Sequence, residues 1–252
     1  MAGLLTRLFK GKASLNLDAA AWAEAMAQPV FGGLGTEERA RLRKLAAELL
    51  ADKTFSGAAG AEVDEYMATV IAGLAVLPVL NLGYGWYKGW QEIVVYPGEF
   101  VHEGEHMDED GVVHHVRHVR SGEAMEGGPM VLSWDDVAAS GGGDGYNVVI
   151  HEFAHKLDMK NGEANGRPPL HPDMSSDAWA RAFGEAYADL CRQVDAGLET
   201  AVDAYASESP AEFFAVLTEY FFEAPAILHG CYPAVYEQLR LFYRQNPLKR
   251  LD

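Results

Sequence analysis

Apolar residues recur at helical spacing along much of this chain. Between residues 36 and 50 they fall on one face, and Thr36 stands where a capping residue is expected, ahead of acidic residues in the first turn. The same spacing predicts further helices over residues 62–77, 177–196, 209–223 and 233–246. Most of the chain is therefore expected to be helical.

Strand patterns are fewer and shorter. A β-branched and aromatic run over Ile93–Tyr96 stops at Pro97, and similar patterns cover Val112–Val119 and Pro129–Trp134. We expect these three segments to form a small mixed or antiparallel sheet, which makes the fold class α+β.

The second of these strands contains His114, His115 and His118, a group that invites comparison with a metal site. Neighbouring residues of a strand lie on opposite faces, so adjacent histidines there do not converge on one ion. A solvated strand is the favoured interpretation.

Residues 148–158 combine an apolar helix with the pattern His151-Glu152-x-x-His155. Positions four apart lie on the same face of a helix, so both imidazoles can reach one metal ion, and Glu152 can accept a proton from water beside it. The alternative is a core helix with two satisfied histidines. We favour the metal site, because burying two His and a Glu in an apolar helix is costly unless a metal and a water use them.

Such a site needs a third protein ligand. A His-x-x-Gly-x-x-His extension is absent, since Asp158 and Asn161 occupy its Gly and final His positions. The other option is a Glu on a later helix, where Glu212 is the first candidate and Glu219, two turns along the same face, the second. Glu212 also completes a capping box that begins at Ser209, so a purely capping role is an alternative.

The segments flanking the metal helix allow several roles. Asp158 follows His155 by three residues and could either orient a ligand ring or cap the next turn, and both options stay open. Asn161-Gly162 provides a suitable helix end. The glycine run over 141–145 lacks the Lys-Ser/Thr of a phosphate loop and is interpreted as a flexible approach to the helix.

Composition limits the class of protein. The 252 residues are 49% hydrophobic, and we expect one domain over residues 1–252, with a helical part over 1–60 and a catalytic core over 90–252. The most apolar stretch, 71–82, is too short to span a membrane and contains Pro78, which favours a buried core segment. The net charge of −17 argues against direct nucleic-acid binding.

Location is constrained by the N-terminus and the cysteines. Arg7 and Lys10 interrupt the apolar residues that a secretory signal would require. The two cysteines, Cys191 and Cys231, have no C-x-x-C spacing and are interpreted as ordinary buried thiols. A cytoplasmic protein is therefore expected.

Two segments together resemble a known family. His151-Glu-Phe-Ala-His-Lys-Leu-Asp158 and the later segment running from Tyr205 through Glu212-Phe-Phe-Ala-Val216 resemble the Mlc titration factor A family of zinc peptidases. The later segment is also similar to the catalytic domain of anthrax lethal factor. Further similar stretches are Leu77-Pro-Val-Leu80, Val94–Pro97, Gly128–Leu132 and Asn246-Pro-Leu-Lys-Arg-Leu251.

The resemblance implies a zincin-like peptidase fold and a set of site residues. It implies one Zn²⁺ per chain bound by His151, His155 and Glu212, with Glu152 as general base and Tyr205 as a hydroxyl donor to the oxyanion. It further implies aminopeptidase-like activity on short peptides and an interaction with the transcriptional repressor Mlc. The alternative is a non-catalytic protein that sequesters a repressor, although such a protein has no need for Glu152.

Substrates of zinc peptidases bind as an added strand along a sheet edge. Residues 129–134 precede the metal helix and are the candidate edge.

Overall fold

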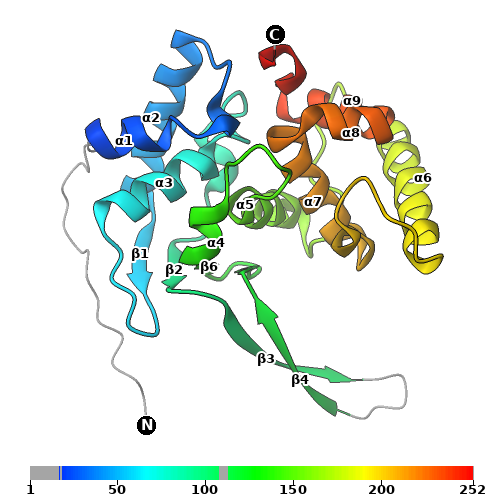
Figure 1. The fold of residues 1–252 in the computed structure, drawn as a ribbon, viewed down its shortest axis with the longest axis horizontal. Coiled ribbons are helices and arrows are strands. Elements are labelled where there is room, and N and C mark those ends of the chain that lie inside the picture. Colours follow the sequence, from blue (N-terminus) through cyan, green and yellow to red (C-terminus); the bar gives the residue numbers. More distant parts are fainter. Residues whose placement is uncertain (1–16, 18, 108–112, 252) are drawn as a thin grey trace.

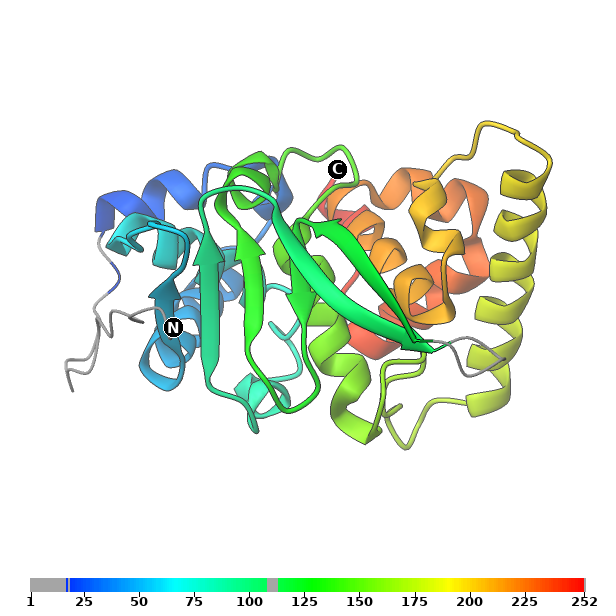
Figure 2. The same cartoon turned by 90° about the horizontal axis from the view of Figure 1, so that it is seen from below.

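The computed structural model describes residues 17, 19–107 and 113–251. Helices cover one face of a small sheet, and a β-hairpin projects from the other side (Figures 1 and 2). The helices are α1 (Ala19–Ala25), α2 (Thr36–Asp52), α3 (Glu65–Val76), α4 (Trp134–Ala139), α5 (Val148–Asp158), α6 (Ser176–Asp195), α7 (Pro210–Glu223), α8 (Pro225–Cys231) and α9 (Pro233–Tyr243). The strands are β1 (Thr54–Gly57), β2 (Glu92–Tyr96), β3 (Phe100–Met107), β4 (Val113–Arg120), β5 (Gly122–Ala124) and β6 (Met130–Ser133). Short 3₁₀ helices are η1 (Pro29–Phe31), η2 (Tyr84–Tyr87), η3 (Met159–Asn161), η4 (Ala204–Ser207) and η5 (Pro247–Arg250).

The main sheet has the strand order β1-β2-β6-β5. Its first three strands run parallel, with Ile93 opposite Met130, whereas β5 runs antiparallel to β6, with Gly122 opposite Leu132. The α+β class and the small mixed sheet are thus confirmed. The antiparallel β5 lies at the edge of the sheet.

Two sequence expectations about this sheet are wrong. The strand expected over Val112–Val119 is β4, which begins at Val113 and pairs with β3 in a separate hairpin, not with the main sheet. The segment 129–134 is not an edge, because β6 is bonded to β2 on one side and to β5 on the other. The true edge, Gly122–Ala124, went unrecognised because it is three residues long and lacks β-branched or aromatic side chains.

The expected helices are all present, with small shifts at their ends. Gly35, not Thr36, caps α2, and its N–H donates to Glu38 Oε2 at 3.0 Å. Asp64 caps α3 by accepting a bond from the N–H of Met67. After η3, Gly162 adopts a φ of 132°, which favours glycine and ends the segment as expected.

One continuous cluster of buried apolar side chains connects the N-terminal helices with the C-terminal half of the chain. It includes most of the apolar segment 71–82, as predicted. Phe153 of α5 lies fully buried within it, with its ring centroid 4.8 Å from that of Tyr87 and 5.6 Å from that of Trp90. Helix α5, which carries His151 and His155, is therefore held in position by aromatic packing on its core side.

Cys191 and Cys231 are free thiols, but both are partly exposed, which corrects the expectation that they are buried. Among the described residues, no helix combines the length and apolar character needed to cross a membrane. Arg7 and Lys10, which were expected to interrupt a secretory signal, lie outside the described residues.

Candidate metal centre and active site

The helix α5 presents two histidines to a cleft while its other side is held in the core. Asn147 caps the helix, its Oδ1 accepting a bond from the N–H of Ile150 at 2.9 Å. His151 and His155, one turn apart, are both buried, and their Nε2 atoms lie 3.2 Å from each other. The apolar residues between and around them supply the rigidity that such a pair requires.

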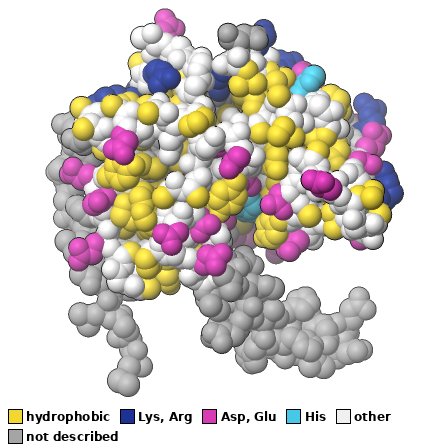
Figure 3. Space-filling model, in the orientation of Figure 1, with side chains coloured by type: hydrophobic (Ala, Val, Ile, Leu, Met, Phe, Trp, Pro, Cys, Tyr) yellow, Lys and Arg dark blue, Asp and Glu magenta, His cyan; other side chains and the backbone are white. Residues whose placement is uncertain are grey.

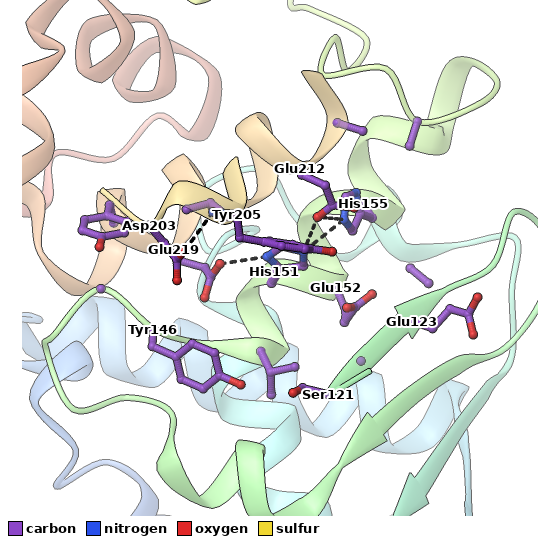
Figure 4. A pocket seen from close by; sticks show the side chains of 18 of the residues that line it. Ser121, Glu123, Tyr146, His151, Glu152, His155, Asp203, Tyr205, Glu212 and Glu219 are labelled. Carbon is purple, nitrogen blue, oxygen red and sulfur yellow. Dashed lines mark hydrogen bonds and ion pairs between the residues drawn. The ribbon is translucent and has the colours of Figure 1, made fainter. Parts of the chain in front are cut away.

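The helix α7 brings a carboxylate to the same point. Ser209 caps this helix and Pro210 takes its first position, which places Glu212 in the first turn. Glu212 Oε2 lies 3.0 Å from His151 Nε2 and 3.4 Å from His155 Nε2. Of the two options for Glu212, these distances favour a metal ligand, because its carboxylate is directed at the histidines (Figure 4).

The three donors fit a tetrahedral divalent ion. Bonds of about 2.0–2.1 Å in tetrahedral geometry place two donors about 3.3 Å apart. The spacings of 3.2, 3.0 and 3.4 Å among the donor atoms agree with this value. Two imidazoles and one carboxylate also form the donor set of catalytic sites that keep a fourth position open.

The electrostatics of the centre are dominated by facing carboxylates. Burial acts to lower the pKa of His151, but Glu219 and Glu212 outweigh it and raise that pKa well above its usual value. Burial acts to raise the pKa of Glu212, yet bonds from the two imidazoles hold it well below its usual range. A positive charge is therefore strongly favoured among these groups.

Glu219, the second candidate ligand, plays another part. Its Oε1 accepts from Nδ1 of His151 at 2.8 Å, and its Oε2 accepts from the N–H of Asn147 at 2.6 Å. Such a bond fixes the tautomer and orientation of a ligand ring. Glu219 therefore supports His151 at Nδ1, while Glu212 binds at Nε2, where the two imidazoles converge.

Asp158 fills neither of the roles left open by the sequence, because its side chain makes no cap hydrogen bond to η3 and instead binds the chain further along. Its Oδ2 accepts from the N–H groups of Asn165 at 2.7 Å and Gly166 at 2.6 Å, and its Oδ1 from that of Arg167 at 2.8 Å. The buried Nδ1 of His155 has no hydrogen-bond partner among the described residues. Asp158 thus does not orient that ring.

Two further side chains that the sequence singled out border the centre. Glu152 is buried on the side of α5 that faces β5. Tyr205, in η4, is 44% exposed, and its ring centroid lies 6.2 Å from that of His151. Figure 4 shows the Tyr205 ring lying across the metal ligands, with Glu152 below it.

These residues line a cleft of about 660 Å³. Figure 3 shows acidic side chains gathered around a hollow in which histidine is visible. The described residues that line it include six carboxylates and no Lys or Arg; the acids are Glu123, Asp144, Glu152, Asp203, Glu212 and Glu219. Two of these acids were not predicted from the sequence. Glu123 lies on the unrecognised strand β5, and Asp203 caps η4 by accepting from the N–H of Tyr205 at 2.9 Å.

The glycine-rich segment before α5 contributes Asp144 and Gly145 to the cleft wall. The N–H of Gly143 donates to Glu223 Oε2 at 2.7 Å, and Asn147 Nδ2 donates to Glu223 Oε1 at 2.6 Å. Burial raises the pKa of Glu223 to about 7, and Asp144 and Glu219 add to the effect.

A two-histidine helix facing a carboxylate from a later helix, beside a mixed sheet with an antiparallel edge strand, defines a zincin-like metallopeptidase. A family model described as glucose-regulated metallo-peptidase M90 matches residues 9–244. Mlc titration factor A of Escherichia fergusonii is 40% identical over 245 residues, covering 96% of this chain and 92% of that protein. Mlc titration factor A of Yersinia pestis (strain Pestoides F) is 42% identical over 236 residues, covering 92% and 87%. The chain belongs to the glucose-regulated metallo-peptidase M90 family.

Proposed function

We propose that this chain is a zinc-dependent aminopeptidase that acts on short peptides. The observation that carries the proposal is the convergence of His151 Nε2, His155 Nε2 and Glu212 Oε2 beside the buried Glu152. A structural zinc site would normally use four protein ligands and have no need of an adjacent carboxylate. One Zn²⁺ per chain would be held by these three residues.

Zinc, when bound, lowers the pKa of water and polarises the scissile carbonyl. Glu152 accepts the proton of the attacking water and passes it to the leaving amine. Tyr205 donates its hydroxyl to the oxyanion that develops on the carbonyl, a contribution of roughly 3 kcal/mol in comparable sites. Its partial exposure at the cleft, next to His151, supports this role.

The peptide would bind along β5. This strand lies at the sheet edge, and Ser121–Ala124 line the cleft, so its main chain can pair with an extended substrate. The excess of carboxylates in the cleft favours a substrate with a positive charge near the scissile bond. A free α-amino group provides that charge, which supports cleavage at the N-terminus.

A second proposed function is binding of the repressor Mlc, which the name of the relatives suggests. Both functions are compatible with a single cytoplasmic protein. The acidic surface implied by a net charge of −17 supports a partner with a basic face.

A panel of chromogenic amino-acid and peptide substrates tests the first function. Wild type is compared with Glu152→Ala, before and after chelation and zinc readdition. We expect hydrolysis only in the zinc-loaded wild type. After zinc readdition, both wild type and Glu152→Ala should reach full zinc occupancy. Zinc-loaded wild type that cleaves none of the substrates would contradict the peptidase proposal. Glu152→Ala should still bind purified Mlc, which separates the two functions.

A further inference from the structure

Gly122 of the edge strand β5 lies directly against Glu152, the proposed general base. A Cβ built on Gly122 would lie 2.5 Å from Glu152 Oε1, 2.6 Å from its Cγ and 2.8 Å from its Cδ. All three separations are shorter than the contacts that real side chains adopt, so no residue larger than glycine fits here without displacement. The backbone of Gly122 is therefore part of the surface against which the Glu152 carboxylate rests.

The strand is held in place from two sides. Along β6, Gly122 is opposite Leu132, and the N–H of Ser133 donates to Ser121 O at 2.8 Å. Beyond the strand, Lys156 Nζ donates to Met125 O at 2.6 Å and to Gly128 O at 2.9 Å.

Lys156 lies one turn after Glu152 on the same face of α5, so the helix both contacts β5 and clamps the turn that follows it. These hydrogen bonds prevent β5 from shifting to make room for a side chain at residue 122. The Glu152 side chain, which has rotatable bonds, is the part that can move.

We propose that Gly122 is a positioning residue for catalysis, which sets the place of the Glu152 carboxylate by direct backbone contact. The inference rests on the proposed role of Glu152. It links substrate binding and proton transfer through one residue, since the strand proposed to pair with the peptide also forms the wall behind the base.

The test compares Gly122→Ala with Gly184→Ala. Gly184 lies in α6, where an added Cβ meets nothing within 4 Å. We expect Gly122→Ala to bind zinc as wild type does and to lose about a hundredfold in kcat, the scale of an error of about 1 Å in a catalytic group. Gly184→Ala should keep the kcat of wild type.

The double variant Gly122→Ala/Glu152→Ala provides the specific readout. Ala lacks the Cγ, Cδ and Oε1 atoms that the new methyl group would strike, so Gly122→Ala should destabilise the protein less in the Glu152→Ala background than in wild type. If Gly122→Ala alone fails to fold, the double variant should regain stability. Equal losses of stability in both backgrounds, or no gain in stability, would overturn the inference.

A crystal structure of zinc-free Gly122→Ala gives a readout that is independent of activity. We expect the Glu152 carboxylate to move by more than about 1 Å while β5 keeps its register with β6. An unmoved carboxylate beside a shifted β5 would refute the positioning role. A wild type that shows no zinc-dependent hydrolysis would instead contradict the proposed function. The crystal structure would then still show whether Gly122 sets the position of the Glu152 carboxylate.

Discussion

At the scale of single residues, the centre depends on groups that lie outside the set of three metal donors. Glu219 shows this most clearly, because it was a candidate ligand by sequence and binds Nδ1 of His151, the ring nitrogen away from the other donors. Spacing along α7 could not distinguish the two roles: Glu212 and Glu219 lie on one face, and only the position of α5 determines which of them reaches the Nε2 atoms of the histidines.

Replacing Glu219 tests its supporting role. Glu219→Gln should lower zinc affinity by about ten- to a hundredfold, because the amide holds the His151 ring less firmly and stabilises its polarised form less. Competition with a fluorescent chelator measures the dissociation constant, with the exposed Glu185→Gln on α6 as control. Zinc binding equal to wild type would show that Glu219 serves the helix cap and not the metal.

At the scale of elements, α7 acts as a single template for the site. Its buried face presents Glu212 to the histidines, Glu219 to the ring of His151, and Glu223 to the glycine segment and Asn147. Sequence periodicity predicted this helix and its cap at Ser209 correctly, because both are local signals. The partners of the acids come from residues about 70 positions away in the chain, and local patterns contain no such information.

Glu223 predicts a pH dependence of stability. Its folded pKa of about 7 lies above the ordinary value of 4.5, so the folded state binds the proton more tightly than the unfolded chain. Its stabilising contribution is present below about pH 4.5 and is lost as the pH rises through about 7. The difference of about 2.5 between these two pKa values corresponds to a loss on the order of 3 kcal/mol.

Urea unfolding of wild type and Glu223→Gln between about pH 5 and pH 8 measures this contribution. The free energy of unfolding of wild type should fall over this range more steeply than that of the variant. Parallel profiles would mean that Glu223 does not titrate as its burial suggests.

At the scale of the whole molecule, the sequence predicted the fold class and the helices but not the sheet topology. β5 is too short to show a pattern, and the segment that becomes β3 is interrupted by charges, so neither strand could be recognised before its partner was known. The metal helix could be recognised because one local segment combines an apolar periodicity with a dense set of ligands. Whether the chain unfolds as the single domain predicted from its length stays a prediction.

The shared core makes that prediction testable. Phe153→Ala removes a fully buried ring between the two halves and should cost roughly 3–5 kcal/mol. If the chain is one cooperative unit, tryptophan fluorescence and far-ultraviolet circular dichroism should shift together to lower urea concentration in the variant. Two separate transitions would indicate that the N-terminal helices and the catalytic half unfold independently.

The length of β5 limits how many main-chain hydrogen bonds a peptide bound beside it can form. At about 3.4 Å per residue, its three residues span only about 10 Å. A peptide laid beside the strand can therefore form only a few main-chain bonds, and further residues would extend past its end without adding to the ladder. In the proposed binding mode, selectivity would come from the first residues of the peptide, and product release would be fast because so few bonds must break.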